Sequence, residues 1–352
     1  MSQPNRVSPR ISPRSLAGHE RLPVRLSHVA SAKRYVKLTL RSCCELTYRN
    51  EMEDIRRYVD EQIFTLPGLE NKEELIVLLT GSRATGTNTD ESDVDIDVLC
   101  PSKVYYSIQK EMLSAQKTNS VYNAFYKLPE HNWERYFGSK ANRPHFSLLK
   151  FDDIRQRIEE YDDVHHWIWN NAKVIQDSHG RFRDLLSEYK SYPMGVLVNK
   201  IKYRWLLSLY WFIDGYPWHH KSDLELLPAG TAIFNGINEL YRFFFLVEGK
   251  PYPYQEKLAS FVRQTSLGAK YIDYLTNIVE MVIGADGNME PWKRLDKAVE
   301  MLCCSDRSIV LEKMEKECSE AMIKIGVDPS WVAADYDNID ELLMGKLGVA
   351  PF

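Results

Sequence analysis

The pattern of hydrophobic and polar residues changes near residue 190. Upstream, residues 75–80 (LIVLLT) form a continuous apolar run and residues 94–99 (VDIDVL) alternate apolar with acidic side chains, as strands do. A third candidate strand covers residues 145–151 (HFSLLKF). Helical periodicity covers residues 52–66, 102–117, 152–160 and 163–172. The first half is therefore predicted to mix strands and helices.

Beyond Tyr192-Pro193 the sequence has helical patterns and no strand pattern. The clearest helix covers residues 196–212, where apolar residues recur on one stripe: Leu197, Ile201, Trp205, Leu209 and Phe212. Further helices are predicted at residues 233–247, 254–264, 271–283 and 292–303. The predicted fold class is α+β, with a small mixed-sheet domain followed by an all-helical bundle.

These patterns divide the chain into four segments. The mixed-sheet domain spans residues 52–190 and the helical bundle spans residues 191–327. A basic arm, residues 1–51, precedes them. Residues 328–352 form a tail, predicted as one further helix and a loose end.

Composition narrows the class of protein. The 352 residues include 44% hydrophobic side chains, enough for two packed domains. No apolar run reaches the ~18 residues that a membrane span needs. Six cysteines without a C-x-x-C motif indicate neither a zinc site nor a disulfide framework. We therefore expect a cytoplasmic protein without a membrane partner.

The net charge of −4 is unevenly distributed. Residues 1–44 contain nine Lys or Arg and one acid, a net of +8, which leaves −12 for the rest of the chain. The Arg-, Ser- and Pro-rich opening is predicted to be disordered to about residue 34. Three interpretations fit it: a solvated tail, an organelle transit peptide, or sequence upstream of a start at Met52.

The segment 80–97 (TGSRATGTNTDESDVDID) carries the candidate chemistry. A buried strand ends in a Gly81-Ser82 turn, and a short helix is predicted to begin there and to end at Gly86. Backbone N–H groups at such a strand-to-helix turn form an anion nest, to which the Ser82 hydroxyl adds a donor. The turn therefore predicts a phosphate site.

The next strand carries three acids, Asp93, Asp95 and Asp97, at alternate positions. Alternation places all three on one face. Carboxylates in this arrangement repel one another unless a cation lies between them, and oxygen ligands select Mg²⁺ or Mn²⁺. A phosphate nest before a metal-binding strand predicts a site for ATP or another nucleoside triphosphate.

Other phosphate and metal motifs fail on specific residues. A Walker A loop would need Lys and Ser or Thr where Thr87 and Asn88 stand. An EF-hand counted from Asp93 would need Gly at its sixth position, which is Val98. No G-x-G-x-x-G dinucleotide motif is present. Solvated acids on an edge strand are the competing structural explanation, and the preceding turn disfavours it.

Gly81-Ser82, Gly86 and Ser92-Asp93-Val94-Asp95 together resemble the signature of the DNA polymerase β-like nucleotidyltransferase superfamily. The nearer resemblance is to its aminoglycoside-type and minimal bacterial branch. Residues 172–186 are similar to the strand, Asp-x-x-Gly turn and helix that end the catalytic domain of those relatives. The resemblance implies transfer of a nucleoside monophosphate from a nucleoside triphosphate to a hydroxyl group, with release of pyrophosphate.

The resemblance also implies roles for individual residues. Gly81 and Ser82 would hold the β- and γ-phosphates, and Asp93 and Asp95 would hold two metal ions. In relatives a Lys near the domain junction reaches the triphosphate, which points to Lys202, with Lys200 as the alternative. A solvated helix face is the competing explanation for both lysines.

The family adds a third carboxylate from a neighbouring strand, and here that strand, residues 145–151, contains no acid. Asp97 is the predicted substitute as a metal ligand, although its Cα would lie roughly 6.6 Å from that of Asp95. Asp152 and Asp153 follow the strand and His145 begins it. A helix N-cap explains either acid structurally, and a strand end explains His145.

Aromatic and histidine residues offer further candidates. His165-His166 beside Trp167 suggests a metal or stacking site, but adjacent histidines point in different directions. Tyr252 and Tyr254 are candidates for an acceptor or base pocket, with rigid packing at a helix start as the alternative.

The sequence predicts a metal-dependent nucleotidyltransferase that transfers a nucleoside monophosphate, AMP in the first instance, to a small hydroxylated molecule of antibiotic type. Two alternatives remain. The first is a nucleotidyltransferase whose acceptor is RNA or protein. The second is a nucleotide-binding pseudoenzyme that lacks the third carboxylate.

Overall fold

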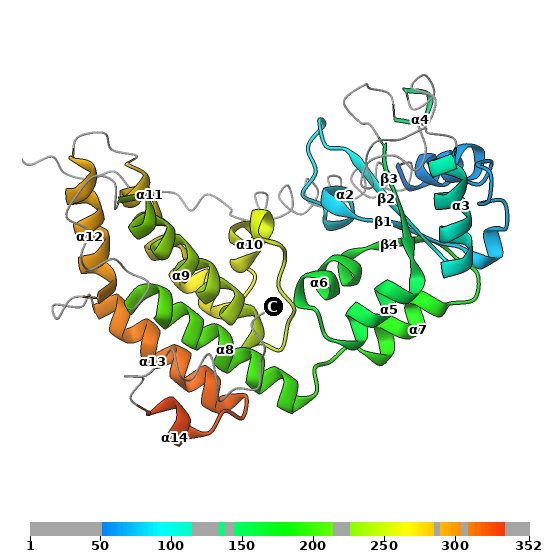
Figure 1. Cartoon of the computed structure of the whole chain (residues 1–352). Coiled ribbons are helices and arrows are strands. Elements are labelled where there is room, and N and C mark those ends of the chain that lie inside the picture. Colours follow the sequence, from blue (N-terminus) through cyan, green and yellow to red (C-terminus); the bar gives the residue numbers. More distant parts are fainter. Residues whose placement is uncertain are drawn as a thin grey trace, which may run out of the picture. The chain divides into compact units, whose positions relative to one another are not determined.

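The computed structural model in Figure 1 describes residues 51–114, 134–137, 144–213, 226–284, 289–303 and 309–334. Residues 57–352 belong to one compact unit. The predicted basic arm lies outside the described residues except for Glu51, and so does the tail beyond Ala334. The interpretations of the arm and the division at residue 190 therefore stay predictions.

A four-stranded mixed sheet occupies the first half of the chain, in the order β3-β2-β1-β4. Its strands are β1 (Ile76–Leu79), β2 (Val94–Cys100), β3 (Pro144–Lys150) and β4 (Lys173–Asp177). β1 runs antiparallel to both β2 and β4, whereas β2 and β3 are parallel. The three strands predicted from the hydrophobic pattern are confirmed, and β4 corresponds to the strand implied by the family resemblance.

Helical segments precede the first strand and connect the strands. Residues 51–58 are helical and continue as the π-helical turn η1 (Val59–Ile63), where the Phe64 N–H donates to the Val59 carbonyl. The single regular helix expected over residues 52–66 is thus widened at its end. The remaining elements are η2 (Lys72–Glu74), α2 (Gly81–Thr85), α3 (Ser102–Ser114), α4 (Glu134–Phe137), α5 (Phe151–Glu159), α6 (Asp163–Asn171) and α7 (Arg181–Glu188).

From residue 194 onward, the described residues are helical and contain no strand. They form α8 (Met194–Ile213), α9 (Leu226–Leu246), α10 (Gln255–Val262), α11 (Ser266–Ile283), α12 (Pro291–Cys303), α13 (Ile309–Lys324) and α14 (Pro329–Val332). None of the described helices is long and apolar enough to cross a membrane. The predicted all-helical second half is confirmed.

Two helices of this half start earlier than their apolar periodicity predicted. Pro228 lies in the first turn of α9, where its missing N–H would have no helical partner in any case. α11 begins at Ser266 because the Thr265 side chain accepts from the Gly268 N–H at 3.0 Å. The helix α13 was not predicted at all.

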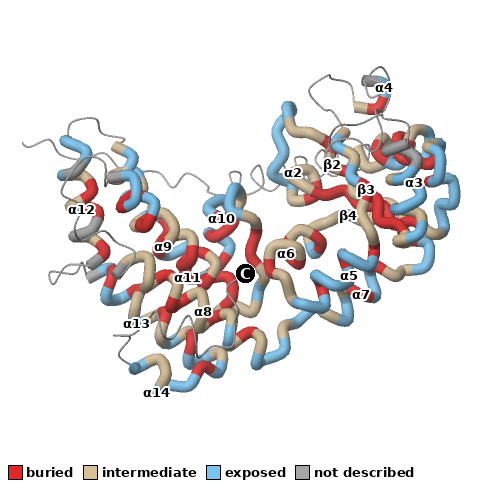
Figure 2. Tube along the Cα trace, in the orientation of Figure 1, coloured by how far each residue is buried: buried red, intermediate tan, exposed pale blue. Residues whose placement is uncertain are grey.

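Each half has its own hydrophobic core, and α6 contributes to both. Trp169 packs with the sheet residues Ile76 and Leu78 and with α5 and α7. Trp167 packs instead in the helical core, with its ring centroid 4.9 Å from that of Phe261. Buried positions accordingly mark the strands and the inward sides of α8, α9 and α11 in Figure 2.

Candidate active site

The strand β1 delivers the chain into the Gly81-Ser82 turn, as predicted. All four β1 residues are buried, and the Thr80 N–H donates to the Asp95 carbonyl at 2.9 Å. The helix α2 runs from Gly81 to Thr85, and its C-cap residue Gly86 has a left-handed φ of 72°. The Thr87 N–H then donates to the Ser82 carbonyl at 2.9 Å, which closes the helix end.

Gly81 lies directly against the carboxylate of Asp95. A Cβ added at Gly81 would lie 1.8 Å from Asp95 Oδ2, and the Gly81 φ is +67°. Both the close approach and the left-handed backbone require glycine here. The turn and the acidic strand, read separately from the sequence, therefore form one site.

The acids of β2 alternate with buried residues, as the sequence pattern predicted. Val94, Ile96 and Val98 are at most 1% exposed on one face of the sheet. Asp95 and Asp97 lie on the opposite face, and Asp93 directly precedes the strand. That face continues into Leu99, which packs beneath α5, α6 and α7.

Arg83 holds the loop that leads to Asp93. Its Nε donates to the Ser92 and Asp93 carbonyls at 3.2 and 3.1 Å, and its Nη2 donates to the Ser92 carbonyl at 2.8 Å. These bonds link α2 to the start of β2 and so position the first acid. Sequence reasoning missed Arg83, whose position on the short helix after the turn was the only signal.

Burial and mutual repulsion raise the pKa values of two of these acids, Asp95 and Asp97. Burial raises the pKa of Asp95, and the neighbouring charge of Asp93 raises it further. Burial raises the pKa of Asp97 to about 7, opposed by a hydrogen bond from Thr80. A bound divalent cation would offset both costs, because it favours the ionised carboxylates.

His145 lies between the first two acids. Its Nε2 is 3.6 Å from Asp93 Oδ2 and its Nδ1 is 3.5 Å from Asp95 Oδ1. The parallel register that pairs Asp95 with His145 places them on one face. His145 thus faces two acids at the start of β2 directly, which is more than the strand-end position considered for it.

Asp152 and Asp153, the other candidates for the missing acid, lie elsewhere. The helix α5 begins at Phe151 with Lys150 as its N-cap, so the N-cap interpretation of both acids is wrong. Asp152 accepts from the Ser102 hydroxyl at 2.8 Å, and Asp153 pairs with Lys150 at 2.9 Å. Neither lines the pocket described next.

A pocket of about 280 Å³ opens on the acidic face of β2. Gly81, Asp95, Asp97 and His145 form its polar part, and Trp167, Ile168 and Tyr254 form its apolar wall. Thr80, Ala84, Thr85 and Ser147 complete the lining. The pocket therefore joins acidic and apolar surfaces, drawn from the sheet, α6 and the start of α10.

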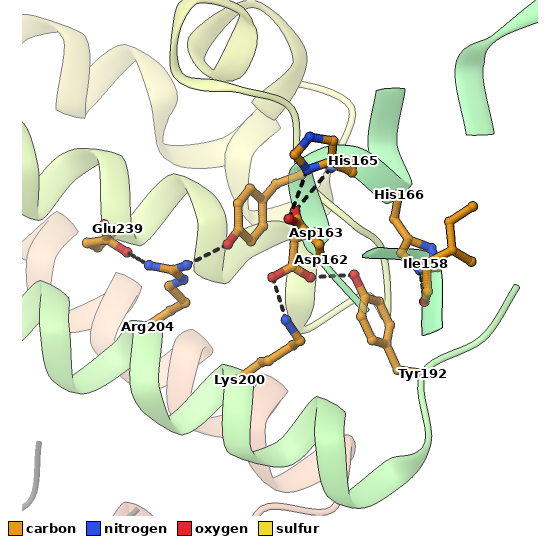
Figure 3. A network of polar contacts seen from close by, with 10 residues as sticks. Ile158, Asp162, Asp163, His165, His166, Tyr192, Lys200, Arg204 and Glu239 are labelled. Atoms are coloured by element: carbon orange, nitrogen blue, oxygen red, sulfur yellow. Dashed lines mark hydrogen bonds and ion pairs between the residues drawn. The ribbon is translucent and has the colours of Figure 1, made fainter. Parts of the chain in front are cut away.

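The lysines predicted to reach a triphosphate do not line this pocket. Lys200 pairs with Asp163 at 2.8 Å (Figure 3), and the Lys202 ammonium lies 5.0 Å from the centroid of the Trp331 ring. Asp328, near Trp331, also faces the charge of Lys202. A role for Lys202 at the triphosphate stays a prediction, and it requires the side chain to leave Trp331.

A buried polar network fixes α6 against α8. Asp163 accepts from the Tyr192 hydroxyl at 2.5 Å and from Lys200 at 2.8 Å (Figure 3). Arg204 donates to Glu239 at 2.8 Å and to the Tyr252 hydroxyl at 2.6 Å. This network positions the helix that carries Trp167 and Ile168, and it assigns Tyr252 to packing rather than to the pocket.

His165 and His166 have separate partners. His165 Nδ1 lies 2.8 Å from Asp162, whereas His166 Nε2 lies 2.7 Å from the Ile158 carbonyl (Figure 3). The described residues contain no ready-made group of three metal-ligating side chains, here or elsewhere.

Two glycines provide a matched test of the Gly81–Asp95 contact. Gly81 and Gly86 both have left-handed φ, but only Gly81 has a neighbour within 4 Å of an added Cβ. Gly86→Ala should lower the free energy of unfolding by about 1 kcal/mol through backbone strain alone. Gly81→Ala should lower the free energy of unfolding by about 1 kcal/mol more, because its Cβ would clash with Asp95 and displace that side chain.

Urea unfolding and calorimetric titration with Mn²⁺ plus an ATP analogue measure both effects. Only Gly81→Ala should weaken metal binding. Equal stability loss and equal metal affinity in the two variants would show that the contact is unimportant.

The raised pKa of Asp97 predicts a pH-dependent stability. The folded protein holds this proton up to about pH 7, whereas the unfolded chain releases it near pH 4. The contribution of Asp97 to stability therefore decreases as pH rises from 4 to 7, and the unfolding temperature of Asp97→Asn should rise relative to wild type over that range. Thermal melts in a metal chelator at pH 5 and pH 8 check this. A constant difference between the two proteins would contradict it.

Comparison with known proteins finds a family match for the sheet-containing part. No curated protein matches the chain significantly. The crystal structure of a nucleotidyltransferase-like protein from Exiguobacterium sibiricum 255-15 is similar with a TM-score of 0.40 and 12% identity, over 77% of this chain and 78% of that chain. Residues 69–213 match the family described as Nucleotidyltransferase domain. The matched residues include all four strands of the sheet and every residue that lines the pocket except Tyr254.

Proposed function

We propose that the protein transfers a nucleoside monophosphate, AMP in the first instance, from a nucleoside triphosphate to a hydroxyl group of a small molecule, with release of pyrophosphate. The observation that carries this proposal is the direct contact between Gly81 and Asp95 beside a pocket. It brings the phosphate-binding turn and the acidic strand of a nucleotidyltransferase domain together. Within the superfamily, we place the chain in the aminoglycoside-type and minimal bacterial branch on its sequence signature.

The residues present fit a divalent cation. Asp93 and Asp95 supply hard oxygen donors. Asp95 and the more deeply buried Asp97 line the pocket, whereas Asp93 lies outside its lining. The desolvated, mutually repelling carboxylates gain stability from a cation, which supports Asp93, Asp95 and Asp97 as its ligands. When bound, Mg²⁺ or Mn²⁺ would neutralise triphosphate charge and favour ionisation of the acceptor hydroxyl.

The turn at Gly81 and Ser82 is suited to hold the triphosphate. The first N–H groups of a helix have no partner within the helix, and they attract anions. Arg83 holds the loop that carries Asp93 and thereby orients its carboxylate. The chain's own residues thus bind the phosphates and fix the acids that face them.

The apolar wall supports a small acceptor. Trp167 and Tyr254 lie with ring centroids 6.1 Å apart at an interplanar angle of 81°, and Ile168 lies beside them in the pocket. Such a wall offers stacking and apolar contact to a planar base or to the ring of an acceptor. A pocket of about 280 Å³ is suited to a small molecule rather than to a folded macromolecular surface.

Substitution of the acids tests the proposed activity. We expect Asp93→Ala and Asp95→Ala to reduce pyrophosphate release from radiolabelled ATP with Mg²⁺ or Mn²⁺ by at least about 100-fold, because each removes a charge that holds the metal. Asp97→Asn should also lose activity, whereas Asp153→Asn, a matched change outside the pocket, should retain it.

Equal pyrophosphate release from wild type and Asp95→Ala would contradict the proposed catalytic activity. Metal-dependent ATP binding by the wild type, without release in the presence of any hydroxylated acceptor tried, would instead identify a pseudoenzyme. Activity with RNA or protein as acceptor, and none with small molecules, would show that the acceptor is a macromolecule.

A further inference from the structure

The tyrosine at the start of α10 is the side chain that the helical half contributes to the pocket. Every other described residue of the lining lies between Thr80 and Ile168, inside the segment that matches the nucleotidyltransferase domain family. Tyr254 lies beyond that segment and is the N-cap residue of α10. The family match therefore assigns no role to this side chain.

The Tyr254 ring is held in place from two sides. Trp167 packs edge to face against it, with the ring centroids 6.1 Å apart at an interplanar angle of 81°. Pro253 restricts the backbone on its other side, and Tyr252 is anchored there by a 2.6 Å hydrogen bond from Arg204 to its hydroxyl. The Tyr254 hydroxyl is therefore presented to the pocket by a fixed ring.

The Tyr254 hydroxyl has no hydrogen-bond partner among the described residues, whereas the Tyr252 hydroxyl is bound by Arg204. Burial raises the pKa of Tyr254, and the charges of Glu256 and Asp95 raise it further. The Asp95 carboxylate is thus near enough for its charge to act on this hydroxyl. Because Asp95 also lies directly against Gly81, the hydroxyl and the phosphate-binding turn border the same part of the pocket.

A triphosphate in this pocket gains from hydrogen-bond donors beyond the backbone N–H groups of the turn. The described residues that line the pocket include no Lys or Arg. The Thr80 hydroxyl is engaged with Asp97, and the Thr85 hydroxyl is engaged with carbonyls of α2. Ser147 lies on β3, which β2 separates from the strand that leads into the turn. Tyr254 therefore offers the side-chain hydroxyl best placed for the phosphates.

We infer that Tyr254 is a nucleotide-contacting residue whose hydroxyl donates a hydrogen bond to the triphosphate held at the Gly81-Ser82 turn. The inference rests on the proposed function, because it concerns the same nucleotide. The sheet half then supplies the turn and the acids, and the helical half supplies a neutral donor. Such a donor binds phosphate without adding a positive charge that would compete with the metal ion for the acids.

Calorimetric titration of the full-length protein tests this contact. The probes are a non-hydrolysable ATP analogue and inorganic tripolyphosphate, each with Mn²⁺. Tyr254→Phe removes the hydroxyl and keeps the ring, and it should weaken the binding of both probes by about 10-fold, as expected for a hydrogen bond to a charged group.

Tyr203→Phe is the matched control. Tyr203 is a half-buried tyrosine of α8 that lies outside the pocket, and its hydroxyl also has no hydrogen-bond partner among the described residues. Loss of this hydroxyl should leave the affinity for both probes unchanged.

Amide hydrogen exchange gives a second readout, which a purely structural role of Tyr254 would not change. Saturation of the wild type with Mn²⁺ and the ATP analogue should slow exchange at the start of α10, because the ligand would be bonded to the N-cap residue of that helix. Tyr254→Phe, saturated in the same way, should lack this added protection and should match wild type without ligand.

The outcomes separate this inference from the function on which it rests. Unchanged affinity of Tyr254→Phe for both probes, together with loss of binding in Asp95→Ala, would overturn the role of Tyr254 and leave the proposed function standing. Weaker binding of the ATP analogue alone would place the hydroxyl on the nucleoside and overturn its contact with the phosphates. Absence of metal-dependent binding of either probe by the wild type would overturn both the inference and the proposed function.

Discussion

The pairing of β2 with both of its neighbours is the constraint on which the site depends. Antiparallel pairing with β1 brings Asp95 against the turn that follows β1, where only glycine leaves room for its carboxylate. Parallel pairing with β3 places His145 beside the same acid. A shift of one residue in either register would turn the acids to the other face of the sheet, so the site and the sheet are specified together.

The second half of the chain supports the pocket by packing against α6, a helix of the first half. This helix sends Trp169 into the sheet core and Trp167 into the helical core, and the Asp163, Tyr192 and Lys200 contacts hold it against α8. The apolar wall of the pocket thus rests on the packing of the helical half. Changes in that packing are expected to affect the binding of a molecule that contacts this wall. They are expected to affect the positions of the acids less.

Much of the fold follows from local sequence. The apolar run before Gly81, the alternation from Val94 to Leu99 and the glycine at 86 predicted β1, β2 and α2, because each depends on neighbours along the chain. The surroundings of His145, Arg83 and Lys202 were not predictable in this way. The partner of His145 lies 50 residues away along the chain, and Lys202 meets Trp331 through tertiary packing alone. Register and packing partners of this kind are set by the whole fold.

The central claim is that Asp93 and Asp95 hold a divalent cation against a nucleotide at the Gly81-Ser82 turn. Crystals grown with Mn²⁺ and a non-hydrolysable ATP analogue test it most directly, through the anomalous scattering of manganese. The account predicts an anomalous peak in contact with both carboxylates and the triphosphate at the turn. A bound nucleotide whose manganese peak lies away from Asp93 and Asp95 would contradict it.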